Sequence, residues 1–271
     1  MQPILYQSKI ADMEYCDLSG RDATLWHVPH LHRDLELVIL LEGEVTVFTD
    51  SKKSRLTAGD IFLAFPNQIH YYESVSAKQR YHLLIVKPDI MPDLMDDFNT
   101  CVPESPVLRG EANDPALRLL YERLFRYCGE TADRPYLQAL KHGYLLAFFS
   151  ELLSRMRLSR IVTGDAGSLR TIVTFCTQHY NEDLSLALLE ERLHLNKYYI
   201  SHLFSKRLGL RFNDYVNSLR VSEACRYLAV TDLGITEISE RVGFNTLRTF
   251  NRAFMKLHGM APSEYRKSAT Q

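Results

Sequence analysis

The sequence predicts a two-domain protein of the α+β class. It should have an N-terminal β-barrel with a helical connector, and a C-terminal all-α domain with two helix-turn-helix motifs. Short apolar segments between turn residues fill the first part of the chain, helical periodicity follows, and two helix-turn-helix patterns come last. The 271 residues suffice for two domains. We expect the barrel at 1–95, the connector at 96–160, a linker at 161–168 and the helical domain at 169–271.

Short strands predict the barrel. Residues 35–41 form an apolar run interrupted only by Glu36, and further short apolar segments lie at 45–48, 61–65 and 81–86. Asp50 and the three polar residues after it are predicted to form a hairpin turn. Short strands with turns about every ten residues are typical of β-sandwiches and barrels.

Helical periodicity predicts the connector. Two stretches between 114 and 158 place apolar residues at helix spacing. We interpret Leu145, Phe148 and Leu152 of the second stretch as a dimer stripe, with packing against the chain's own barrel as an equal alternative. Residues 161–168, which contain two glycines, are predicted to be the linker.

The first helix-turn-helix unit starts with a supporting helix that carries Leu186, Leu189 and Leu193 on one face. Asn196 is a good N-cap for the helix that follows. That second helix buries its apolar residues, including Ile200. Its predicted outward face consists of Lys197, Tyr198, Ser201, His202 and Lys206.

The second helix-turn-helix unit repeats this pattern, and its outward residues should distinguish DNA base pairs better than those of the first. Gly243 supplies the left-handed residue that ends a helix, and the next helix turns Phe250 and Phe254 inward. Its outward residues are Leu247, Arg248, Asn251, Arg252 and Lys256. Arginine pairs with guanine and asparagine with adenine, so this helix should discriminate sequence better than the first. A long helix predicted over 212–228 fixes the distance between the units, and successive major grooves on one face lie about 34 Å apart.

At these residues the chain resembles the AraC/XylS family of bacterial transcription regulators. The resemblance covers about residues 169–267. Matching positions in the first unit are Leu186, Leu189, Leu193, Tyr199, Ile200, Ser201, Phe204, Gly209, Tyr215, Arg220 and Ala224. Matching positions in the second are Ile238, Gly243, Phe244, Phe250, Arg252, Phe254, Lys256, Gly259, Pro262, Tyr265 and Arg266.

The resemblance implies a homodimeric regulator that binds double-stranded DNA at promoter half-sites. It favours activation by recruitment of RNA polymerase, with repression as the alternative. By position in the family's motif, Tyr198, Ser201 and His202 would meet base edges, with Lys197 and Lys206 nearer phosphates. Glu190 stands where the family usually has a small residue, so it must swing out or widen the helix crossing.

The N-terminal part contains a second pattern, His30, His32 and Glu36 followed by Gly43. Residues two apart on a strand share a face, so these side chains project to one side if one strand runs through them. A further segment ends in His70. The pattern resembles the cupin barrel, in which three histidines and a glutamate hold a divalent metal in the metal-containing members. The second segment departs from that pattern, because Gln68 replaces a glycine and His70 falls one position early.

Three interpretations of this cluster remain open. The favoured one is a small-molecule effector site without metal or other cofactor, with a carbohydrate as the favoured class, since AraC-type regulators carry such barrels. Trp26 and Tyr72 would then stack on the sugar. The second interpretation is a metal pocket on His30, His32, Glu36 and His70, sensory or enzymatic. In the third, the polar groups satisfy one another, and the protein regulates without a ligand.

The distribution of charge fits a DNA-binding module joined to a second domain, and we expect no enzymatic activity. From Leu169 onward there are 14 basic and 10 acidic residues, against 18 basic and 23 acidic residues in 1–168. The five cysteines are scattered without a CxxC pair, which argues against a disulfide framework or a zinc site. No apolar run is long enough to span a bilayer and no signal-peptide pattern is present, so we expect a cytoplasmic location without membrane contact.

Overall fold

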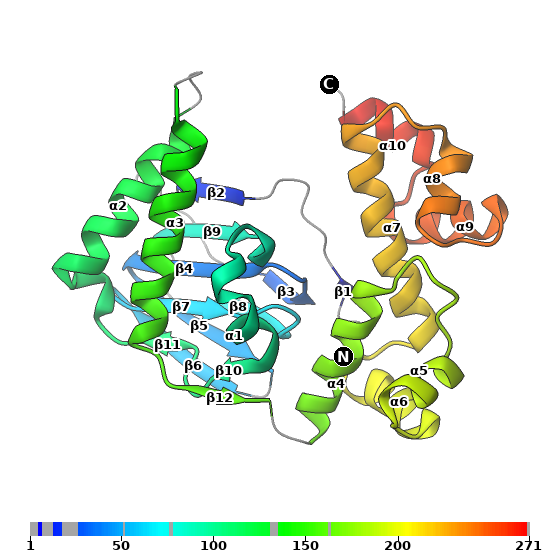
Figure 1. Ribbon diagram of the computed structural model, residues 1–271, viewed down its shortest axis with the longest axis horizontal. Coiled ribbons are helices and arrows are strands. Elements are labelled where there is room, and N and C mark those ends of the chain that lie inside the picture. The colour runs from blue at the N-terminus through cyan, green and yellow to red at the C-terminus, as the bar shows by residue number, and fades with distance from the viewer. Residues whose placement is uncertain are drawn as a thin grey trace. The chain divides into compact units, whose positions relative to one another are not determined.

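The computed structural model describes residues 5–6, 13–17, 27–50, 52–75, 78–130, 135–161 and 164–269 (Figure 1). The chain forms two compact units, one drawn mainly from residues 11–162 and the other mainly from 163–271. The first unit is rich in β-strands and the second is helical. This confirms the predicted two-domain α+β class.

The N-terminal part of the chain contains two five-stranded sheets. One has the order β1 (Leu5–Tyr6), β3 (His27–Leu31), β8 (His70–Ser74), β5 (Glu44–Thr49) and β6 (Lys52–Thr57). The other has the order β11 (Val107–Leu108), β7 (Ile61–Ala64), β4 (Leu35–Glu42), β9 (Arg80–Val86) and β2 (Met13–Asp17). Apolar side chains of β4, β5, β7 and β9 are buried as the sequence predicts.

Strands β6 and β8 are among the strands that the sequence did not predict. The expected turn is tighter than the sequence indicates: Asp50 has φ 54°, and β6 already starts at Lys52. Strand β6 is exposed along most of its length, with only Leu56 buried, so it lacks an apolar signal. It is the edge strand, where charged residues such as Lys53 are common. Strand β8 lacks that signal for the opposite reason, because it carries the polar side chain of His70 into the interior.

The helices of this unit pack onto the second sheet. Helices α2 (Pro115–Gly129) and α3 (Leu137–Ser154) lie side by side in Figure 1. Leu145, Phe148 and Leu152 are fully buried in the same core cluster as Leu37 and Leu84 of the sheet. The interpretation of these three residues as a dimer stripe is therefore wrong, and they pack against the chain's own barrel. The remaining elements here are η1 (Pro88–Ile90), η2 (Pro92–Leu94), α1 (Met95–Thr100), β10 (Cys101–Pro103), η3 (Glu111–Asn113) and β12 (Leu158–Arg160), the last paired antiparallel with β10.

Asp60 ties two loops of the barrel together. Its buried carboxylate accepts hydrogen bonds from the backbone amides of Thr57 and Gly110, each at 2.9 Å. It also accepts one from the Arg109 guanidinium at 2.6 Å. Burial would raise the pKa of Asp60, but the two amides and Arg109 together lower it below its ordinary value.

We predict that Asp60→Asn lowers the free energy of unfolding by about 3 kcal/mol at neutral pH, because an amide cannot satisfy all these donors. A carboxylate with a lowered folded-state pKa stabilises above its ordinary value of 3.8, and the stabilisation is lost as pH falls through the folded-state pKa. Urea unfolding should therefore show the difference between variant and wild type shrinking between pH 5 and about pH 3. Asp89→Asn, at an exposed aspartate of the same unit, should show neither effect.

Within residues 164–269, every described element is a helix. These elements are α4 (Asp165–Gln178), α5 (Leu186–Leu193), α6 (Lys197–Leu203), the π-turn η4 (Phe204–Leu208), α7 (Phe212–Val230), α8 (Ile235–Arg241), α9 (Leu247–His258) and α10 (Pro262–Ala269). Helix α7 connects the two helix-turn-helix units (Figure 1). Helix α4 starts inside the stretch predicted as linker, since Asp165 suits the positive end of a helix. Among the described residues, no helix is long and apolar enough to cross a membrane.

Candidate DNA-recognition helices and barrel site

Local hydrogen bonds set the start of the first recognition helix, α6. Asn196 Oδ1 accepts from the Tyr198 amide at 2.9 Å, which confirms the predicted N-cap. The residue before the turn, His194, has φ 55° and ends α5. Ser185 in turn caps α5 by accepting from the Leu188 amide at 3.1 Å. His194 and Asn196 thus end α5 and start α6, and they define the turn between the two helices.

The two faces of α6 differ as predicted. Ile200 and Leu203 are fully buried. Tyr198 is 74% exposed, and Lys197 lies half-buried with Nζ 5.5 Å from the centroid of the Tyr198 ring. The other outward residues, Ser201, His202 and Lys206, are exposed.

The Glu190 side chain reaches the start of α6. Its Oε1 accepts a hydrogen bond from the backbone amide of Lys197 at 3.1 Å. The amide belongs to the first turn of α6, where helix donors lack intrahelical partners. The glutamate at this position therefore adds a second cap to the recognition helix.

A polar contact also connects α6 to the start of α4. The Tyr199 hydroxyl donates to Asp165 Oδ1 at 2.9 Å, and Arg207 Nη2 lies 3.5 Å from Asp165 Oδ2. The hydrogen bond from Tyr199 is the main cause of the lowered pKa of Asp165. The orientation of α6 thus depends on the first residue of α4, next to the stretch that joins the two units.

The second recognition helix, α9, follows the same design. Thr246 Oγ1 accepts from the Thr249 amide at 3.2 Å, and Phe250 and Phe254 are fully buried. Gly243 has φ 89° and ends α8, as the sequence predicts. The predicted outward residues are all exposed, namely Leu247, Arg248, Asn251, Arg252 and Lys256.

Arg252 and Lys256 differ in their surroundings. The Arg252 guanidinium forms no ion pair or hydrogen bond with any described residue. Lys256 Nζ lies 2.8 Å from Asp214 Oδ1 of α7. Sequence reasoning placed Arg252 and Lys256 together among the DNA-contacting residues. It missed the pairing of Lys256 with Asp214, because these two residues are 42 positions apart.

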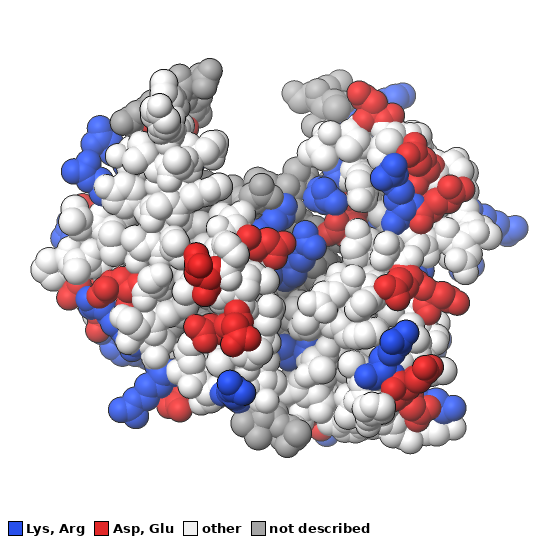
Figure 2. Space-filling view, viewed as in Figure 1, with Lys and Arg blue, Asp and Glu red and all other residues white. Residues whose placement is uncertain are grey.

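Charge alone does not locate a DNA surface on the face shown in Figure 2. Acidic and basic side chains are interspersed there, with no continuous basic area. The candidate interface therefore rests on the exposed residues of α6 and α9.

The barrel holds a buried polar cluster. Tyr72 of β8 donates its hydroxyl proton to Glu36 Oε1 of β4 at 2.5 Å. His70 Nε2 lies 3.5 Å from Glu36 Oε2, and His70 Nδ1 donates to the Gln68 carbonyl at 2.9 Å. All three residues are at most 4% exposed. Since Nδ1 is held by a carbonyl, Nε2 is the imidazole atom that faces the cluster.

The charges in this cluster shift its titration. Burial would lower the pKa of His70, but the charge of Glu36 and its hydrogen bond, with the Gln68 carbonyl, raise it above the ordinary value. Burial and Glu36 hold the pKa of Tyr72 well above its ordinary value, so the phenol remains a donor. The arrangement offers both donors and an acceptor in an apolar interior.

His30, His32, Glu36 and His70 are brought together as the sequence predicts. Their nearest nitrogen and oxygen atoms all lie within 4.8 Å of one another, and all four residues are buried. The predicted reason is wrong, because no single strand runs through the motif. Strand β3 ends at Leu31 and β4 starts at Leu35 in the other sheet, so the chain changes sheets between the histidines and the glutamate.

Gln68 supports the buried cluster, and sequence reasoning missed this. It appeared only as a departure from a glycine pattern. Its Oε1 accepts from the Phe65 amide at 2.8 Å and its Nε2 donates to Asp50 at 3.2 Å. These bonds hold the turn in place, and the Gln68 carbonyl in this turn orients His70. Trp26, the other predicted aromatic contact, lies outside the described residues.

Two family models match the chain. One describes an AraC-like ligand binding domain and matches residues 16–171, and the other describes a helix-turn-helix domain and matches residues 189–268. The chain belongs to the AraC family. It is a DNA-binding transcription regulator with a ligand-binding domain, as the sequence resemblance implies.

Curated relatives of this AraC-family chain are bacterial regulators. The uncharacterized HTH-type transcriptional regulators YobQ and YfiF of Bacillus subtilis are 25% and 21% identical, over 90% and 88% of this chain and 90% and 78% of theirs. YtdP of the same organism is 34% identical over 35% of this chain, but the match spans only 12% of its own length.

Solved structures of ToxT from Vibrio cholerae share the fold. An apo structure of a ToxT variant gives a TM-score of 0.54 at 18% identity, covering 94% of this chain and 96% of that chain. Wild-type ToxT bound to an unsaturated fatty acid gives 0.52 at 18% identity, over 94% of each chain.

Proposed function

We propose that this AraC-family regulator is controlled by a small polar effector, of the carbohydrate class, which binds in the barrel and changes the affinity of the C-terminal domain for promoter DNA. The effector-contacting residues are His30, His32, Glu36, His70 and Tyr72. Helices α6 and α9 read the DNA. The family resemblance supports a homodimer that activates transcription through RNA polymerase.

The buried polar cluster carries this proposal. Burying polar groups costs free energy unless they are satisfied, and most of the surrounding barrel core is aliphatic. Carboxylate, imidazole and phenol groups together match the alternating donors and acceptors of vicinal hydroxyls. A fatty acid, the ligand in the ToxT complex, would bring its carboxylate to a cluster that already contains Glu36. A neutral polyhydroxyl ligand avoids this repulsion.

Thermal unfolding of the full chain against mono- and disaccharides, their phosphates and fatty acids tests the effector class. A ligand present at about 100 times its dissociation constant should add about 2.7 kcal/mol, a shift of several degrees. Glu36→Gln should abolish the shift. Glu73→Gln, at an exposed residue of the same strand as Tyr72, should keep it.

Two outcomes would contradict the proposal. A shift with fatty acids and none with sugars would replace the carbohydrate class by a lipid class. Equal DNA affinity with and without a ligand that binds would contradict effector control and favour a regulator governed by its abundance.

A metal-bound sensor is the second candidate, and the convergence of His30, His32, Glu36 and His70 favours it. The donor set fits, since imidazoles and one carboxylate suit zinc, iron or manganese, and the ligand atoms are close enough to share one ion. These four residues would hold the ion, which would then bind or polarise an effector oxygen. Metal analysis of purified protein should find about one ion per chain, lost in His32→Ala. Absence of stoichiometric metal after refolding with each ion would reject this candidate.

A further inference from the structure

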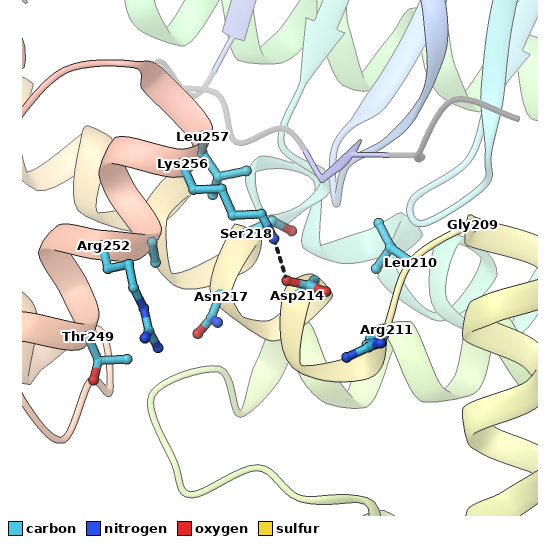
Figure 3. A pocket seen from close by; sticks show the side chains of 11 residues that line it. Gly209, Leu210, Arg211, Asp214, Asn217, Ser218, Thr249, Arg252, Lys256 and Leu257 are labelled. Atoms are coloured by element: carbon cyan, nitrogen blue, oxygen red, sulfur yellow. Dashed lines mark hydrogen bonds and ion pairs between the residues drawn. The ribbon is translucent and has the colours of Figure 1, made fainter.

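A groove runs between α7 and the recognition helix α9 in the C-terminal unit. Its cavity volume is about 750 Å³. Figure 3 shows its walls, with Arg252 and Thr249 projecting from α9 and Asp214 and Asn217 from α7. Arg211, immediately before α7, lines the far end. We call this cavity the α7–α9 groove.

The groove carries an excess of positive charge. Arg211, Arg252 and Lys256 line it, against one acid, Asp214. The two arginines are exposed, and their guanidinium groups form no ion pair or hydrogen bond with any residue that the structure describes. Lys256 is 68% exposed while paired with Asp214, so its ammonium can also face a second anion. Such a lining selects a ligand with more than one negative charge.

The lining also differs from that of the usual small-molecule pocket. Pockets for drug-sized ligands are lined mainly by apolar and aromatic side chains. No aromatic residue lines this groove, whereas asparagine and threonine side chains supply further donors beside the three cations. Phosphate oxygens are the acceptors that this mixture of arginine, lysine, threonine and asparagine contacts in protein–DNA complexes.

The place of the groove in the fold identifies the source of phosphate. Helix α7 separates the two recognition helices and has 19 residues, a length of about 28 Å. Two helices that enter successive major grooves are about 34 Å apart. The phosphate backbone between those grooves therefore passes α7, the helix that connects the two helix-turn-helix motifs. We propose that the α7–α9 groove binds the sugar–phosphate backbone of DNA between the two major grooves, through Arg211 and Lys256. This inference rests on the proposed DNA contacts of α6 and α9.

Asp214 then has a defined role. Its carboxylate holds Lys256 at the groove and offsets one positive charge there. An acid beside a phosphate weakens binding to every DNA sequence alike. We therefore expect Asp214→Asn to bind DNA more tightly at low salt, with unchanged sequence preference.

The test measures the salt dependence of DNA binding by the full chain. The probe is a labelled mixed-sequence duplex of about 30 base pairs, long enough for two major grooves and their flanks. Each lost phosphate contact should make the slope of log affinity against log salt shallower by about 0.9. For Arg211→Gln and for Lys256→Gln, the wild-type advantage should shrink about threefold between 50 and 200 mM salt. Arg241→Gln removes an exposed cation of α8 outside the groove and should keep the wild-type slope.

An unchanged slope in Arg211→Gln, with thermal unfolding like the wild type, would overturn the proposal. A loss of stability without a change of slope in Lys256→Gln would assign that lysine to the fold alone. Displacement of DNA by inorganic phosphate at constant ionic strength, abolished by Arg211→Gln, would indicate a site for free phosphate instead. The slope does not depend on sequence preference, so failure of base recognition by α9 would be seen separately, in Arg252→Ala.

Discussion

Replacing Arg252 with alanine should weaken binding to the operator by about 1–3 kcal/mol, which is roughly 5- to 150-fold. Arg252 is exposed on α9, and its guanidinium forms no ion pair or hydrogen bond with any described residue. A guanidinium without an intramolecular partner is available for bidentate pairing with guanine. The variant should also relax sequence preference at one position. Sequencing of duplexes selected from a randomised pool measures that preference directly.

Arg241→Ala provides the control for this experiment. Arg241 is likewise an exposed arginine of the second helix-turn-helix motif, but it pairs with Glu237 on its own helix, α8, at 3.0 Å. Its loss should leave the selected sequences and the affinity nearly unchanged. If Arg252→Ala selects the same sequences as the wild type, base recognition by Arg252 is contradicted.

The helix-turn-helix units were predictable because their signals are local. Asn196 caps the helix that follows within three residues, and Gly243 takes a backbone conformation that few other residues adopt. Buried and exposed faces of α6 and α9 follow from spacing alone. Sequence reasoning therefore located the exposed residues of both helices.

Contacts between distant positions were harder to predict. The pairing of Lys256 with Asp214 depends on how α9 packs near α7, which no local pattern states. The apolar face of α3 was visible, but periodicity does not identify its partner, and Phe148 packs inside its own unit. In the barrel, the histidines and Glu36 meet because the chain changes sheets between them, and alternation along one strand cannot show this.

Gly243→Ala should be the most destabilising single change in the C-terminal unit that we propose. Gly243 follows α8 with φ 89°, and the next amide, of Phe244, returns to the Ser239 carbonyl at 3.0 Å. A left-handed conformation costs a residue with a Cβ about 1–2 kcal/mol. The added Cβ would also lie 2.8 Å from the Asn181 carbonyl oxygen, so backbone must move. Displacing packed structure costs about 1–3 kcal/mol more. We expect a total loss of about 2–5 kcal/mol.

Two other glycines separate strain from steric contact. Gly259 also has a positive φ, 69°, but a Cβ there meets nothing within 4 Å, so Gly259→Ala should show the strain alone. Gly234 has φ −61° and open space, so Gly234→Ala should be nearly neutral.

The single tryptophan, Trp26, lies far from this unit in sequence. Hydrogen exchange of peptides from α9 is therefore the appropriate measurement. Equal destabilisation by Gly243→Ala and Gly259→Ala would show that Asn181 does not restrict this turn. A larger effect at Gly243 would show that the loop after α4 braces the turn that orients the second recognition helix.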